Sequence, residues 1–206
     1  MAGVPDAVLR GVGRSPEPEP ADAEVISRSQ QLPEFFSLIF DRYFAQVHGY
    51  VARRLGTDLA DDVAAETFLI AFRQRGRYGA TRGPVRAWLY GIATNLMHRH
   101  RRDEVRFYRA LTRVPILNPA ESHEERVAAR VSGLALRRRL AGALAGLAPG
   151  DRDVLLLVAL AELTYEEVAA GLGIAYGTVG SRLSRARREV RKALGQTNPT
   201  TEDIDG

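Results

Sequence analysis

The sequence predicts an all-α protein in which two small helical domains are joined by a flexible linker. Residues 33–111 and 134–194 carry apolar residues at helical spacing, and no stretch alternates apolar and polar residues as a half-buried strand would. Between them, residues 112–133 contain Pro115 and Pro119, which disfavour a continuous helix. The 206 residues are enough for two domains of this size.

Both ends of the chain are expected to lie outside the two domains. Residues 1–32 are rich in Pro, Glu, Ala and Ser, a composition typical of disorder, and residues 195–206 read as a flexible polar tail. The first ten residues lack the pattern of a secretory signal, and no apolar run approaches the ~20 residues of a membrane span. Cysteine is absent, which excludes disulfides and thiolate metal sites, so we expect a cytoplasmic protein without membrane insertion.

Basic residues are clustered along the chain, although the net charge is only +4. The clusters lie at residues 99–109, 137–139 and 182–192. Clusters of this kind indicate a polyanionic partner. A GC-rich coding sequence would produce the same excess of arginine, so composition alone leaves both explanations open.

Residues 164–194 are predicted to form a helix-turn-helix. Thr164 and Glu167 have the spacing of a capping box, and Gly173 stands at the turn, where the backbone needs a positive φ. Ala169 is the small residue at which the two helices touch. The apolar residues that hold the helices together are Val168, Leu172, Ile174, Val179 and Leu183. Upstream, Asp151 is expected to cap a helix that runs from Arg152 to Ala161.

The second helix of this motif has an apolar side and a cationic side, the pattern of a helix that reads the major groove. At 3.6 residues per turn, the apolar side consists of Val179, Leu183, Ala186, Val190 and Leu194. The other side, with Arg182 on its flank, consists of Ser181, Ser184, Arg185, Arg188 and Lys192. We expect the early residues of this side to meet base edges and the later ones to meet phosphates.

Two further helices characterise the N-terminal domain. In the first, residues 57–72, Asp62 and Glu66 share a polar face, and the core-facing residues are Ala60, Ala64, Phe68 and Ala71. A loop containing Gly76, Gly79 and Gly83 leads to the second, which begins after Pro84 and continues to Arg102. Its aromatic residues lead into an arginine run, which suits unstacked bases beside a basic surface, although Trp88 could equally be a core residue.

Together these motifs resemble the extracytoplasmic-function sigma factors of bacteria. Residues 58–72 are similar to the core-binding helix of their region two, residues 86–102 to their strand-opening helix, and residues 163–194 to their region four. The resemblance covers roughly residues 35–111 and 134–194, in the family's order. It implies a non-enzymatic, cofactor-free protein that binds core RNA polymerase, recognises the minus-35 and minus-10 promoter elements and opens the strands to initiate transcription.

The resemblance also implies roles for individual residues. Core polymerase, through its largest-subunit clamp helices and its flap, would meet Asp61, Asp62 and Glu66. The residues for the minus-10 element and strand opening would be Trp88, Asn95, Arg99 and Arg102. Those for the minus-35 element would be Ser181, Arg182, Ser184, Arg185, Arg188 and Lys192. Promoter DNA is the second implied partner, and an anti-sigma factor is a further candidate.

Two other classes of protein fit the sequence less well. A classical helix-turn-helix regulator that binds an operator as a dimer would need a dimerisation surface or effector pocket, whereas the N-terminal half offers an acidic face and an aromatic-basic helix. Binding to core polymerase would distinguish the two. An enzyme would need a phosphate loop, a nucleophile with its base, or a metal cluster. Asp61 and Asp62 are adjacent on a helix, so they point about 100° apart, and no third metal ligand accompanies them.

Overall fold

All regular elements in the described part of the chain are helices, which confirms the all-α prediction. The computed structural model describes residues 20–79, 83–113 and 124–195, except for the side chains of residues 124–132. The N-terminal elements are α1 (Asp22–Ser29), η1 (Pro33–Phe36), α2 (Ser37–Leu55), α3 (Thr57–Gln74), η2 (Arg75–Arg77), α4 (Val85–Met97), η4 (His98–His100) and α5 (Arg101–Leu111). The C-terminal elements are α6 (Glu124–Gly146), α7 (Pro149–Leu160), α8 (Tyr165–Leu172) and α9 (Tyr176–Leu194).

The first module, α1 to α5, is built around the pair α2 and α3. Gly56 joins these helices with a φ of 88°, a conformation that favours glycine. The predicted core face of α3 is confirmed, since its four residues are all buried: Ala60, Ala64, Phe68 and Ala71. The strand-opening helix expected to run on to Arg102 is instead interrupted after Met97 by the 3-10 turn η4, and α5 continues from Arg101.

Part of the segment expected to be disordered, residues 1–32, forms the helix α1. Val25 and Ile26 are 0% and 1% exposed, so this helix contributes to the core. Asp22 secures it against α2, because its carboxylate accepts hydrogen bonds from Arg42 and Tyr43. Burial, followed by this hydrogen bond, raises the pKa of Tyr43 to about 12. Residues 1–19 lie outside the described part of the chain.

The second module consists of α6 to α9. Helix α6 begins at Glu124, so the helix starts earlier than the boundary at residue 134 that the sequence suggests. The rest of the expected linker, residues 114–123, and the expected tail beyond Gly195 lie outside the described residues. The α7 helix begins at Pro149 with Ala148 as its N-cap, so the expectation that Asp151 caps it is wrong. Proline at the first helical position explains the earlier start, because its fixed φ suits that position.

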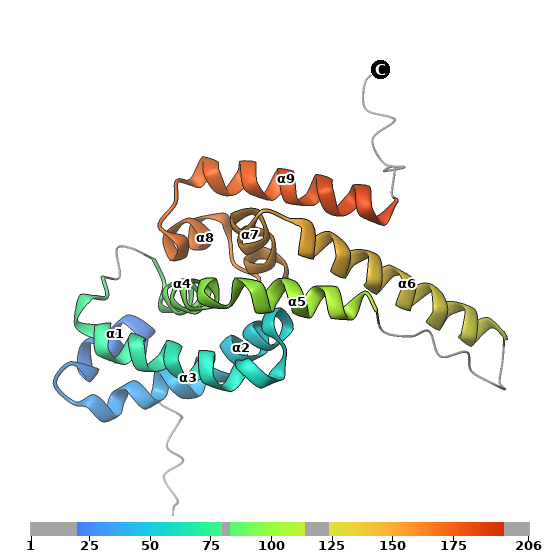
Figure 1. Cartoon of the computed structure of the whole chain (residues 1–206). Coiled ribbons are helices and arrows are strands. Elements are labelled where there is room, and N and C mark those ends of the chain that lie inside the picture. Colours follow the sequence, from blue (N-terminus) through green and yellow to red (C-terminus); the bar gives the residue numbers. More distant parts are fainter. Residues whose placement is uncertain (1–19, 80–82, 114–123, 196–206) are drawn as a thin grey trace, which may run out of the picture.

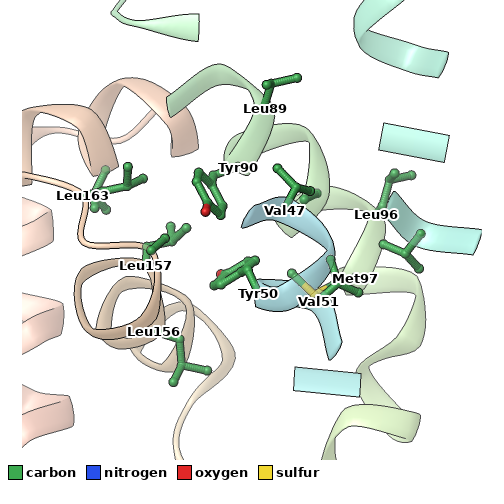
Figure 2. Packing of buried hydrophobic residues seen from close by; sticks show 14 of the residues in the cluster. Val47, Tyr50, Val51, Leu89, Tyr90, Leu96, Met97, Leu156, Leu157 and Leu163 are labelled. Atoms are coloured by element: carbon green, nitrogen blue, oxygen red, sulfur yellow. The ribbon is translucent and has the colours of Figure 1, made fainter. Parts of the chain in front are cut away.

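The two modules pack against each other and share a continuous core. Tyr50 of α2 and Tyr90 of α4 lie beside Leu157 of α7 and Leu163 of the α7–α8 connection (Figure 2). Helix α8 contacts α4, and α6 runs along α5, while α9 lies on the opposite side of the molecule from α1–α3 (Figure 1). The sequence patterns indicated two helical units but gave no sign of this contact.

Candidate nucleic-acid interface

The turn of the C-terminal motif has the predicted geometry. The backbone N–H of Glu167 donates to Thr164 Oγ1 at 3.2 Å, and the N–H of Thr164 donates to Glu167 Oε2 at 2.8 Å, which completes the capping box. Gly173 adopts the left-handed conformation, with φ 63° and ψ 36°. The N–H of Ile174 then donates to the carbonyl of Ala169, so the chain turns directly from α8 into α9.

Helix α9 separates its apolar and polar residues as its sequence predicts. Val179, Leu183 and Ala186 are at most 1% exposed and pack into the core of the second module. On the solvent side, the exposed residues of the predicted minus-35 set are Ser181, Ser184, Arg185, Arg188 and Lys192. An exposed cationic side on a helix whose other side is held firmly is suited to binding in a DNA groove.

Two arginines of this predicted set turn toward the start of α7. The Arg185 guanidinium binds both carboxylate oxygens of Asp151, with Nε and Nη2 at 3.0 and 2.9 Å. The hydrogen bond and charge of Asp151 raise the pKa of Arg185. Arg182 is half-buried, and its guanidinium lies so close to Gly150 that a Cβ there would be 2.8 Å from Nη1. Asp151, expected as a helix cap, therefore holds Arg185.

The predicted polymerase-binding acids lie along one side of α3. Asp61 and Asp62 are exposed and Glu66 is half-buried. Asp61 Oδ1 is 2.9 Å from Nε2 of His48, and Glu66 Oε1 accepts a 2.7 Å hydrogen bond from Nη2 of Arg99. This second contact brings together one residue expected to bind polymerase and one expected to act at the minus-10 element.

A small hollow lies beside Trp88, the residue expected to act in strand opening. Trp88 is half-buried, and its ring centroid is 5.1 Å from that of Tyr78, whose hydroxyl donates to the carbonyl of Gly83. The hollow has a volume of about 170 Å³ and is lined by Arg77, Tyr78, Gly79, Gly83, Trp88 and Ala170. One wall, Ala170, comes from α8 of the other module. Asn95, two turns farther along α4, is exposed.

Sequence comparisons assign both modules to known families. Residues 39–107 match the family model for sigma-70 region 2, and residues 137–190 match that for sigma-70 region 4. RNA polymerase sigma factor CarQ of Myxococcus xanthus is 32% identical over 168 residues, which cover 78% of this chain and 90% of CarQ. ECF RNA polymerase sigma factor SigL of Mycobacterium tuberculosis is also 32% identical, over 79% of this chain and 90% of SigL.

The chain is an extracytoplasmic-function sigma factor. Sigma factors of this family direct promoter recognition, as the sequence resemblance implied. The fold agrees with this assignment: the solved structure of CnrH in complex with the cytosolic domain of CnrY superimposes with a TM-score of 0.59. That match has 25% sequence identity and covers 87% of this chain and all of the CnrH chain.

The sigma factor carries a row of exposed arginines on α5 that the sequence analysis only partly identified. A hollow of about 600 Å³ is lined by Arg101, Arg102, Val105, Arg106, Arg109, Ala110 and Arg113. Arg106 pairs with Asp103 at 2.7 Å. Only Arg102 of this row belongs to the predicted minus-10 set. The helical spacing of Arg102, Arg106, Arg109 and Arg113 would have predicted the row, because these positions share one helix face.

Two exposed side chains on the sigma factor's other surfaces were missed by sequence reasoning. Leu69 of α3 is 46% exposed, three residues beyond Glu66 on the acidic side. Tyr176 is 56% exposed in the first turn of α9. Apolar groups beside a charged face are common at protein interfaces, and an aromatic ring at the start of a groove-binding helix can contact bases or sugars. Neither position interrupts the apolar period of its helix, so the periodicity gave no signal.

Neither metal nor membrane chemistry is indicated by the described residues. In that part of the chain no group of three or more histidine or acidic side chains could hold a metal ion. No helix there is long and apolar enough to cross a membrane.

Proposed function

We propose that this sigma factor uses three separate surfaces. The acidic side of α3, with Asp61, Asp62 and Glu66, binds core polymerase. The hollow beside Trp88 and the exposed Asn95 receive the opened minus-10 strand. The solvent side of α9 reads the minus-35 duplex. The observation that carries this proposal is the division of α9, whose apolar side is buried while its serine and arginine side stays exposed on a helix-turn-helix.

The arginine row on α5 extends the proposed minus-10 surface. Arg99 and Arg102 precede this row, and Arg109 and Arg113 continue it for about three further turns. Several cations on one helix face repel one another, and phosphates of a nucleic-acid strand would relieve that repulsion. We therefore assign to the row the backbone of DNA next to the minus-10 element, as a contact that adds affinity without sequence preference.

The protein partners follow from the same proposal. Core polymerase is the main partner, through its clamp helices and flap, and the protein itself supplies binding without catalysis. An anti-sigma factor is a further candidate, since the similar protein CnrH was solved in complex with the cytosolic domain of CnrY. We propose the cytoplasm as the site of action because polymerase and chromosome are there.

In vitro transcription tests the proposal directly. Core polymerase is incubated with genomic fragments, with and without the purified protein, and transcript start sites are mapped. We expect a small set of start sites that appear only when the protein is present and that share two upstream sequence elements. Sequence-specific binding of a dimer to DNA without polymerase, together with no new start sites, would support the operator-binding regulator instead.

A further inference from the structure

The contact between the modules includes a very close approach of two helix backbones. On α4, Gly83, Ala87 and Gly91 lie four residues apart and face α8 at Ala170 and Gly171. A Cβ on Gly91 would lie 2.1 Å from the carbonyl oxygen of Gly171, and a Cβ on Gly171 would lie 2.5 Å from that of Ala87. These distances are far below van der Waals contact and involve backbone atoms. The closed arrangement therefore requires glycine at both positions.

A buried network of charges joins the modules beside this contact. From the first module, Arg54 Nη2 lies 2.6 Å from Asp153 Oδ1, and Glu104 Oε2 lies 2.9 Å from Arg152 Nη2. Arg54 also binds Glu104 at 2.7 Å, so the four side chains form one chain of ion pairs. All four are at most 3% exposed. His98, at the edge, binds the second carboxylate oxygen of Asp153.

The network is well matched but belongs only to the closed arrangement. Two arginines face two carboxylates, so each buried charge has a partner of opposite sign. Buried ion pairs of this kind have to fit closely, because the cost of removing each ion from water is otherwise uncompensated. When the modules separate, both halves become hydrated, so the network stabilises the closed arrangement only as far as its geometry is intact.

The closed arrangement is too short to contact a whole promoter. A helical turn of DNA is about 34–36 Å long, so elements centred near positions minus 35 and minus 10 are separated by more than two turns, on the order of 80 Å. Here α8, which is joined directly to α9, touches α4. In addition, Ala170 of α8 forms one wall of the hollow beside Trp88. Helix α9 itself stays exposed on the far side (Figure 1).

We propose that the closed arrangement is the resting state of the free protein, in which α8 covers the strand-opening helix, and that the Gly91–Gly171 contact and the Arg54–Glu104–Arg152–Asp153 network hold it shut. Binding to polymerase and promoter then requires the modules to part. The proposed resting state rests on the proposed function only in this last step, because the closed and open forms of the free protein are distinguishable without DNA or polymerase.

The glycine contact offers a sharp test of the free protein. Gly171→Ala places a methyl group against the backbone of α4, and alanine favours helix more than glycine does, so α8 itself is not weakened. Gly171→Leu is the larger version. The matched controls are Gly49→Ala and Gly49→Leu in α2, where a Cβ would meet nothing within 4 Å. Circular dichroism verifies that each variant is helical.

Two readouts follow the distance between the modules. Trp88 is the only tryptophan, so its fluorescence reports on the hollow that α8 covers. The chain has no cysteine, so Ala65→Cys on α3 and Ala193→Cys on α9, both exposed, accept a donor and acceptor dye pair. For the Gly171 variants we expect lower energy transfer, a larger radius of gyration by X-ray scattering and stronger quenching of Trp88 by acrylamide. The Gly49 variants should match the otherwise unchanged protein.

A second measurement uses the dye-labelled protein without any glycine substitution. Energy transfer should be high in the free protein and fall when core polymerase and a promoter fragment from the transcription assay are added. Unchanged transfer in that complex would overturn the proposal, as would Gly171 variants that keep the compact dimensions and the Trp88 quenching of the controls. If the Gly171 variants open but no variant supports promoter-dependent transcripts, the resting state stands and the proposed function fails.

Discussion

Arg54 and Asp153 form a 2.6 Å ion pair although they lie 99 residues apart in the sequence. Each belongs to a different module, and each is at most 3% exposed. Burial alone would lower the pKa of Arg54, but Tyr50, Glu104 and Asp153 outweigh it and the net pKa is raised. The guanidinium is therefore charged at every pH at which the protein is folded, and the pair is a permanent feature of the closed arrangement.

Removing one partner of this pair should be more harmful than removing both. Asp153→Leu leaves an excess buried positive charge, and loss of a single partner from a buried pair typically costs about 3–5 kcal/mol. The double substitution Arg54→Met with Asp153→Leu restores the balance of charge, because Glu104 keeps Arg152, and should recover much of the loss. Urea unfolding of the single and double variants measures this.

The exposed pair Arg28–Glu24 provides the control for the buried one. Its side chains are about half exposed and lie four residues apart on α1, so Glu24→Ala should cost well under about 1 kcal/mol. A double variant that is less stable than Asp153→Leu by the full effect of Arg54→Met would show that the two residues act independently. That result would contradict a coupled network.

The acidic side of α3 predicts a charge-reversal effect on polymerase binding. Asp62→Arg with Glu66→Arg should abolish co-purification with core polymerase, because an exposed acidic face would meet a basic partner with the wrong sign. Glu34→Arg with Asp41→Arg makes the same change in net charge at exposed positions of η1 and α2. The fold should survive in both, as judged by circular dichroism. Normal recovery of core polymerase with the α3 variant would refute this placement of the interface.

Strand opening should depend on Asn95 and Trp88 more than initial binding does. Asn95 is exposed, so Asn95→Ala removes a polar group without a packing cost. Trp88→Ala removes one wall of the hollow but also some packing, because the ring is half-buried against Tyr78. Permanganate reactivity of the minus-10 region measures opening, and a gel shift measures binding. Equal losses in both assays, for Asn95→Ala as well, would indicate a merely structural role. Gln74→Ala, exposed at the end of α3, is the control.

Local patterns in the sequence determined the helices, but the contact between modules lay beyond them. The Thr164–Glu167 box and the Gly173 turn could be predicted because each depends on residues three to five apart. Arg152 and Asp153 stand in a leucine-rich helix, where charged residues usually face solvent. Their burial depends on Arg54 and Glu104, which are distant in sequence and follow no shared period.

The α7 start and the arginines of α9 show the same limit. An aspartate before an apolar helix is a common N-cap, which is why Asp151 was expected to fill that role, yet Pro149 already marks the first helical residue. Asp151 is thereby free to bind Arg185, a tertiary contact that no helical period contains. The periodicity could place Arg185 on the polar side of α9 but could not show which group it would meet.

The last prediction concerns that ion pair and the reading of the minus-35 element. Arg185 is oriented by Asp151, whereas Arg188, one turn later, has only a 3.7 Å contact with its exposed neighbour Glu189. A base-edge contact contributes discrimination of about 1–3 kcal/mol, while a phosphate contact contributes affinity without preference. Arg185→Ala should therefore relax preference at one or two positions of the element. Arg188→Ala should weaken every promoter alike and reduce the salt slope by about one.

Asp151→Ala separates orientation from contact at this site. It leaves the Arg185 guanidinium in place but removes both of its 2.9–3.0 Å hydrogen bonds, so the side chain becomes free to sample other rotamers. If Asp151 presents Arg185 to a base, this variant should lose preference at the same positions as Arg185→Ala, and less completely. If Asp151 instead withholds Arg185 from DNA, affinity should rise for all sequences. Selection from a promoter library at two salt concentrations, with all three variants, distinguishes these outcomes. A changed motif for Arg188→Ala with an unchanged one for Arg185→Ala would mean that α9 lies in the groove with a different face toward the bases.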